Sequence, residues 1–217
     1  SILGLHATAY FIQPRLSVVA PALFVLLWYT LERAPKQKLY YWWPLLFWIW
    51  AALHGSWVLG FIVIGIYFCG NILQIILNQR YPNRFLPSTW NKKIFTEILT
   101  SALIALLATL LNPYGLRLWE EITLYFSHPY YQQFITEWLP SYTYPIYWLP
   151  LVLSAVSLVF VVRGFLTKKI TAAQFLIFVA FFYSGFQYKR NMIYLMLIAV
   201  PLWVGTLGLA WNQLKTA

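Results

Sequence analysis

Hydrophobic runs separated by short polar segments make up most of this chain. The runs approach the ~20 residues that a helix needs to cross a bilayer, and they lack the alternation of barrel strands. Because backbone amides find no water in hydrocarbon, each crossing run must be helical. The pattern predicts an all-α, polytopic transmembrane helix bundle of about seven spans, forming a single domain over residues 1–217. The predicted spans are Leu16–Leu31, Tyr40–Leu53, Trp57–Leu77, Ile94–Leu111, Ile146–Val162, Ile170–Phe186 and Asn191–Trp211.

The second and third predicted spans carry local signals of their own. Pro44 interrupts the second span, so we expect this span to be the least regular. A polar stripe on one helical face of the third span is typical of hydrogen bonding between helices or of a cavity lining, and we expect the former. The stripe consists of Tyr67, Asn71, Gln74 and Asn78. The glycines spread around the same helix and predict close packing on several sides; they are Gly55, Gly60, Gly65 and Gly70.

Composition supports the membrane interpretation. Hydrophobic residues make up 61% of the chain and charged residues 9%, whereas a soluble domain carries about 25% charged residues. Aromatic residues make up 20%, which is typical of a chain that crosses many membrane–water interfaces. The net charge of +10 would also suit nucleic acid. However, the basic residues form short clusters between the apolar runs, so we predict membrane lipids as partners and no nucleic acid.

The Lys and Arg residues divide unevenly between the two predicted sides. Eleven of the 15 lie in the segments after the first, third and fifth spans or at the C-terminus: Arg33, Lys36, Lys38, Arg80, Arg84, Lys92, Lys93, Arg163, Lys168, Lys169 and Lys215. The other side holds Arg15, Arg117, Lys189 and Arg190. Cytoplasmic loops are enriched in Lys and Arg. The division therefore predicts that the basic side and the C-terminus are cytoplasmic.

The one long segment on the predicted outer side runs from Asn112 to Pro145. Its apolar residues fall on one helical face, opposite Glu120, Glu121 and Ser127; they are Leu118, Trp119, Ile122, Tyr125 and Phe126. This pattern predicts an amphipathic helix in the membrane interface, ended by Pro129. A second short helix, roughly over residues 130–138, is expected to present Glu137.

Metal and cofactor motifs are absent from the sequence. His6, His54 and His128 are far apart, Cys69 is the only thiol, and no phosphate-binding loop or nucleophile elbow occurs. We therefore predict no metal site and no cofactor.

Charged residues on the predicted outer side are the best-defined candidates for a functional site. Glu120, Glu121 or Glu137 would supply a general base. The cations of that side would hold an anionic headgroup or a lipid phosphate; they are Arg15, Arg117, Lys189 and Arg190. Taken singly, each of these residues is explained as well by interfacial salt bridges or by snorkelling of its long side chain.

Four short motifs occur in a fixed order along the chain: Gln13-Pro14-Arg15, Trp50-Ala51-Ala52-Leu53-His54-Gly55, Asn112-Pro113-Tyr114-Gly115 and Glu137-Trp138. This order resembles bacterial multispan glycosyltransferases of the GT-C type, which use polyprenyl-phosphosugar donors. In that group a W-x-N-x-H-G-G element, an N-P-Y-G element and an outer E-W element recur. The resemblance covers residues 13–190. Ala52 and Ser56 depart from it, because the group has Asn and Gly at these positions.

The resemblance implies transfer of a sugar from a polyprenyl-phosphate donor to an acceptor at the outer face of the bacterial inner membrane. It implies Glu137 as the base, Arg15, Lys189 and Arg190 as phosphate ligands, and His54 in substrate positioning. The chain contains no Asp, whereas GT-C enzymes generally place an acidic base after their first span. Either the catalytic end lies upstream of Ser1, or Glu137 substitutes, or the chain is not a catalyst.

Two other functions compete with the glycosyltransferase. A non-catalytic accessory subunit of a larger membrane complex is favoured by the aromatic surface and by the absence of Asp. A transporter ranks third, because transporters place ionisable residues at the middle of the membrane, whereas the charges here lie near the ends of the spans.

Overall fold

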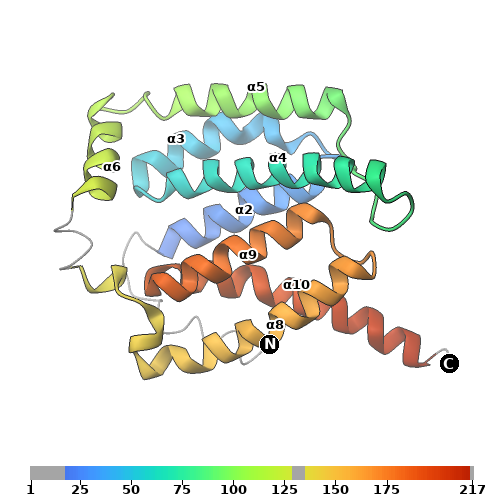
Figure 1. The fold of residues 1–217 in the computed structure, drawn as a ribbon. Helices are drawn as coiled ribbons and strands as arrows, with labels where there is room; N and C mark the ends of the chain where they lie inside the picture. The colour runs from blue at the N-terminus through green and yellow to red at the C-terminus, as the bar shows by residue number, and fades with distance from the viewer. Residues whose placement is uncertain (1–17, 129–134, 216–217) are drawn as a thin grey trace. The chain divides into compact units, whose positions relative to one another are not determined.

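The structure is a computed structural model that describes residues 18–128 and 135–215 (Figure 1). Within these ranges the chain forms eight α-helices and no β-strand, which confirms the all-α prediction. The helices are α2 (Val19–Arg33), α3 (Trp43–Leu53), α4 (Trp57–Arg80), α5 (Lys92–Ala108), α6 (Arg117–Ser127), α8 (Trp148–Leu166), α9 (Ala172–Gln187) and α10 (Met192–Lys215). Each of the seven predicted spans corresponds to one of these helices, and α6 corresponds to the predicted amphipathic helix.

Local sequence signals explain where several helices begin. The Asn91 side chain accepts a hydrogen bond from the Ile94 amide at the start of α5. Thr171 and Gln174 form a reciprocal capping box at the start of α9. Both arrangements satisfy amides that have no partner inside the helix. Pro44 lies in the first turn of α3, where its missing N–H costs nothing, so the helix starts beside it and is not broken by it.

The chain divides into two compact units. Of the described residues, unit 1 contains 66–88 and 137–215, and unit 2 contains 18–65, 89–128, 135 and 136. In unit 1, α8, α9 and α10 pack against one another, and the second half of α4 packs against α9. In unit 2, α3 packs against both α2 and α5. The core of unit 2 is aromatic: Trp43, Phe47 and Trp50 are fully buried.

The glycines of α4 allow close approach to several different neighbours, as predicted. A Cβ at Gly60 would lie 2.7 Å from the Phe47 ring, and a Cβ at Gly70 would lie 2.3 Å from the Ala173 Cα. Gly65 is the exception, because its Cβ would meet open space.

The polar stripe of α4 makes hydrogen bonds within unit 1. Asn71 accepts a hydrogen bond from Ser88 at 3.2 Å, and Gln74 donates to the Leu86 carbonyl at 2.5 Å. Gln74 also accepts from the Ala172 amide at 2.7 Å, which satisfies a free N–H at the start of α9. The stripe therefore ties α4 to the loop that follows it and to α9, in agreement with the expected packing role.

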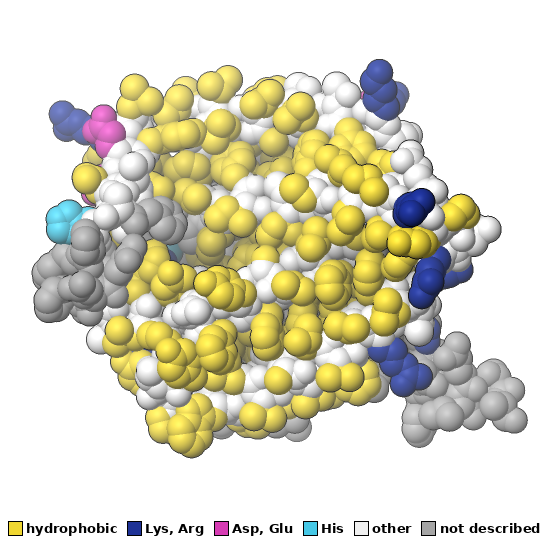
Figure 2. All heavy atoms as spheres, viewed as in Figure 1, with side chains coloured by type: hydrophobic (Ala, Val, Ile, Leu, Met, Phe, Trp, Pro, Cys, Tyr) yellow, Lys and Arg dark blue, Asp and Glu magenta, His cyan; other side chains and the backbone are white. Residues whose placement is uncertain are grey.

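Apolar side chains cover the surface of several helices between their ends (Figure 2). Among the described residues, two helical segments are long and apolar enough to cross a membrane: Trp57–Arg80 and Pro145–Leu166. Only 39% and 28% of the residues in their most apolar windows are buried. A core helix of a water-soluble protein would be mostly buried, whereas these two helices expose much of their apolar surface.

Candidate functional site

One end of unit 1 brings together three of the residues singled out in the sequence: Glu137, Lys189 and Arg190. Glu137 lies in η3 (Thr136–Trp138), and the two cations lie in η6 (Lys189–Asn191), directly after α9. The Lys189 amide donates a hydrogen bond to the Leu139 carbonyl at 3.0 Å. This bond fixes the segment after Glu137 against the end of α9.

A buried serine adds a second tie at the same end. Ser141, in η4 (Ser141–Thr143), is fully buried, and its hydroxyl donates to the Gly185 carbonyl in α9 at 2.5 Å. Buried polar groups need such partners, because an unsatisfied one costs about 1–3 kcal/mol. Residues 137–144 are therefore held at two points, one in α9 and one in η6.

Both cations of this end lie over aromatic rings. The Lys189 Nζ is 3.8 Å from the centroid of the Tyr144 ring, and the Arg190 Cζ is 4.9 Å from the centroid of the Trp138 ring. Such contacts attract a cation to the negative face of the ring. A ring contact leaves N–H groups of an ammonium or guanidinium able to donate to an anion. Glu137 is exposed, and both cations are half-buried.

In unit 2, the turn between α3 and α4 fixes the orientation of His54. Its Nδ1 accepts a hydrogen bond from the Ser56 amide at 3.1 Å and lies 2.9 Å from the Ser56 hydroxyl. The buried Trp50 ring donates through Nε1 to the same hydroxyl at 3.1 Å. Because an amide can only donate, Nδ1 must be the acceptor. In the neutral ring the proton is then on Nε2.

The Asn-Pro-Tyr-Gly motif forms the turn that leads into α6. The Asn112 side chain accepts hydrogen bonds from the Tyr114 and Gly115 amides at 2.7 and 3.1 Å. Gly115 has a φ of +51°, a backbone conformation that residues with a Cβ rarely adopt. Arg117 is the first residue of α6 and is exposed.

The amphipathic helix α6 packs beside the His54 turn. The Trp57 and Trp119 rings lie 5.5 Å apart, and Trp119 donates through Nε1 to the Thr109 hydroxyl at 3.2 Å. Glu120 and Glu121 lie on the exposed face. Two of the sequence motifs, separated by more than fifty residues, therefore share one end of unit 2.

The predicted site residues thus belong to different parts of the structure. Glu137, Lys189 and Arg190 share one end of unit 1, whereas His54 and Arg117 belong to unit 2. Arg15 lies outside the described residues. The supporting residues Ser141 and Tyr144 were not predicted, because their contacts join segments that the sequence pattern does not connect.

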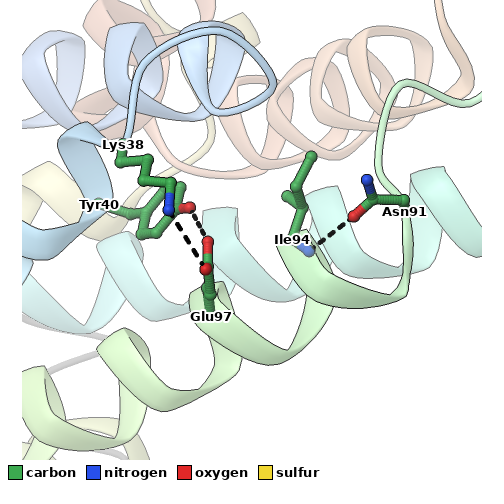
Figure 3. Close-up of polar contacts among 5 residues, drawn as sticks. All are labelled: Lys38, Tyr40, Asn91, Ile94 and Glu97. Atoms are coloured by element: carbon green, nitrogen blue, oxygen red, sulfur yellow. Dashed lines mark hydrogen bonds and ion pairs between the residues drawn. The ribbon is translucent and has the colours of Figure 1, made fainter.

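A charged cluster in unit 2 was also missed. The Tyr40 hydroxyl donates to the Glu97 carboxylate, and the Lys38 ammonium lies 3.4 Å from it (Figure 3). Glu97 comes from α5, whereas Lys38 and Tyr40 come from the segment between α2 and α3. The cluster ties these two segments together. The sequence signal for this cluster is Glu97, an acidic residue one turn after Lys93.

Metal ligands are not grouped in the described part of the chain, where no three His, Cys, Asp or Glu side chains lie together. No family model, curated protein or solved structure matches this chain.

Proposed function

We propose that this chain is a polytopic membrane protein whose seven apolar helices cross the bilayer, with the C-terminus in the cytoplasm. The exposed apolar surfaces of α4 and α8 support the proposal, because lipid is the solvent that favours such surfaces. The amphipathic α6 would lie in the outer interface. The alternation of Lys and Arg between the two sides supports the orientation.

We further propose that the protein transfers a sugar from a polyprenyl-phosphate donor at the outer face, in the manner of GT-C glycosyltransferases. The acceptor hydroxyl would attack the anomeric carbon, and the bond between this carbon and the phosphate oxygen would break. Glu137 would accept the proton of the hydroxyl. Lys189 and Arg190 would stabilise the negative charge on the departing polyprenyl phosphate.

One observation carries this proposal: Glu137, Lys189 and Arg190 lie on two segments that are joined at one end of unit 1. Arg190 lies over the ring of Trp138, the residue that follows Glu137, and Lys189 is hydrogen-bonded to Leu139. A base beside two phosphate ligands is the minimal set that this reaction needs. The motif resemblance assigns the same three residues to these roles.

A transfer assay with the purified chain tests the proposal. A panel of polyprenyl-phosphate hexoses would be supplied with the native membrane fraction as the source of acceptor. We expect Glu137→Gln to slow transfer by about 10²–10⁴-fold and Arg190→Gln by about 10²-fold. Glu121→Gln removes an exposed carboxylate from α6 and is the matched control, with an unchanged rate expected. Equal rates for the three variants and the parent chain would contradict the assignment.

The second candidate is a non-catalytic subunit of a larger membrane complex. The ring contacts of Lys189 and Arg190 favour it, because a cation held on a ring is also a structural device. This function predicts stable co-purification of further membrane proteins from mild detergent. It also predicts that Glu137→Gln leaves the complex intact.

A further inference from the structure

Among the side chains that the structure describes, five cations lie at the end of unit 1 opposite to Glu137. Arg80 lies in the last turn of α4, Arg84 in the following loop, and Arg163 in the last turn of α8. Lys168 and Lys169 lie between α8 and α9. Four of these side chains are exposed, and Lys169 is half-buried. We refer to these five residues as the basic end.

Packing contacts bring the segments of the basic end together. The Phe85 ring lies 5.2 Å from the Phe165 ring, which joins the loop after α4 to the last turn of α8. Phe165 in turn stacks on Phe175 of α9 at 4.9 Å. Asn78 donates to the Leu86 carbonyl at 2.6 Å, which holds this loop against α4. The cations are therefore on neighbouring segments of one surface.

The described segments that form this surface carry no acidic side chain. Residues 66–88 and 148–187 contain five Lys or Arg residues and neither Asp nor Glu. The negative ends of the α4 and α8 dipoles account for a cation in each last turn, as at Arg80 and Arg163. They do not account for Arg84 and Lys168, which lie beyond these turns. The excess positive charge favours an anionic partner.

The surroundings of the basic end favour a lipid over a soluble partner. Leu166 and Val159 of α8 are 60% and 67% exposed, and Ile76 of α4 is 53% exposed. Tyr81, next to Arg80, is 47% exposed. Along these helices, exposed apolar side chains are followed by a tyrosine and by cations. This order is typical of a helix that leaves the hydrocarbon and enters the headgroup layer. A nucleic acid or an acidic protein would meet the cations but would leave the apolar surface uncovered.

We propose that the basic end binds the phosphate headgroups of anionic phospholipids in the leaflet that it faces. Clusters of four to eight cations next to a membrane-spanning helix attract such lipids. The proposal rests on the membrane-spanning part of the proposed function and is independent of sugar transfer. Arginine would contact the phosphate through paired N–H groups, and lysine as a point charge.

Lipid retention by the full chain in detergent tests this proposal. The probes are dimyristoyl phosphatidylglycerol and dimyristoyl phosphatidylcholine, with bound lipids counted by native mass spectrometry. The parent chain is expected to retain the anionic lipid in preference. The triple variant Arg80→Gln, Arg84→Gln, Arg163→Gln is expected to weaken this retention by about tenfold or more. The corresponding triple Arg→Lys variant is expected to retain the lipid, because it keeps the charge.

A control for net charge is the triple variant Lys36→Gln, Lys92→Gln, Lys93→Gln in unit 2. It removes the same charge, and we expect it to leave unit 1 unchanged and to weaken retention by less than about threefold. An equal loss in this control, or no loss in the Arg→Gln variant, would overturn the proposal. Complete displacement of the lipid by inorganic phosphate at an equal concentration would also overturn it, because the site would then recognise soluble phosphate.

Flotation with liposomes of pure phosphatidylcholine distinguishes failure of the lipid-binding proposal from failure of the membrane-spanning proposal. A chain that floats with these neutral liposomes but shows no lipid preference would overturn the proposal for the basic end alone. A chain that does not float would contradict the membrane-spanning proposal on which it rests. Circular dichroism and a single size-exclusion peak would confirm that each variant is folded.

Discussion

The two ends of unit 1 hold their cations in different surroundings. At one end, Lys189 and Arg190 lie over aromatic rings of the segment that follows Glu137, and backbone and serine hydrogen bonds fix the segments that carry them. At the basic end, Arg80, Arg84 and Arg163 are exposed, and no acidic residue is near in the sequence.

This difference separates two uses of positive charge. Cations held at fixed positions over aromatic rings suit a bound ligand of defined geometry, because little side-chain entropy remains to be lost. Exposed cations on several segments suit a fluid partner such as lipid headgroups. The comparison predicts that substitutions at the first end affect stability and chemistry, whereas those at the basic end affect lipid retention.

The largest expected effect concerns the contact between α4 and α9. A Cβ at Gly70 would lie 2.3 Å from the Ala173 Cα, so Gly70→Val must push α4 and α9 apart. We expect a loss of about 3 kcal/mol or more in the apparent free energy of unfolding, measured by titration with SDS in micelles. Gly65→Val on the same helix meets open space and is expected to change stability by less than about 1 kcal/mol. A similar loss in both variants would show that α4 and α9 do not pack in this way.

The next effect concerns the hydrogen bond between Ser141 and Gly185, which holds the segment after Glu137 on α9. Ser141→Ala removes the hydroxyl that donates to the Gly185 carbonyl and leaves a buried acceptor without this donor. We expect a loss of about 1–3 kcal/mol in the same titration. Thr143→Ala removes an exposed hydroxyl that donates to the Pro140 carbonyl, three residues earlier, and is expected to cost about 0.5 kcal/mol or less. Equal costs would contradict the difference in burial.

A double-mutant cycle tests the ring contact directly. Arg190→Gln and Trp138→Leu, made singly and together, should give a coupling energy of about 0.5–1 kcal/mol. At the basic end, Arg163→Gln is expected to change stability by less than about 0.5 kcal/mol. A coupling energy of zero would mean that Arg190 gains no stability from the Trp138 ring. The two ends of unit 1 would then not differ in how they hold their cations.

The smallest effect concerns the turn after α8. Lys168 has a φ of +59°, in the left-handed region that glycine adopts without strain. Lys168→Gly should raise stability by about 0.5 kcal/mol, because the relieved strain exceeds the added entropy of the unfolded chain. Lys169→Gly removes a charge from the same turn without relieving a positive φ, and we expect no gain from it. A loss of stability in Lys168→Gly would contradict the turn geometry.

The helices of this fold were predictable, because each needs a long apolar run and each run has few polar interruptions. Pro44 shows the limit of that reasoning. A proline in the middle of a hydrophobic run predicts a break in the helix. Pro44 instead lies in the first turn of α3, because the residues before it form the separate short helix η2 (Leu39–Trp42).

The candidate site was predictable only in its charged residues. Lys189 and Arg190 stand out in a chain with few charges, and a short motif singles out Glu137. The contacts that hold them depend on residues far apart in sequence: Ser141 and Gly185 are 44 positions apart. Tyr40 and Glu97, 57 positions apart, show the same limit in unit 2. A hydrogen bond of this kind depends on the packing of whole helices, which the pattern of hydrophobic positions does not specify.

The most direct test of the central proposal is the sidedness of the segments between the helices. In a Cys69→Ser background, single cysteines would replace the exposed residues Ser127 and Thr143 on the predicted outer side, and Thr89 and Thr167 on the predicted cytoplasmic side. A membrane-impermeant maleimide would be applied to right-side-out and inverted vesicles. We expect the first pair to react only in right-side-out vesicles and the second pair only in inverted ones. Reaction of all four positions from the same side would contradict a bundle in which seven helices cross the membrane.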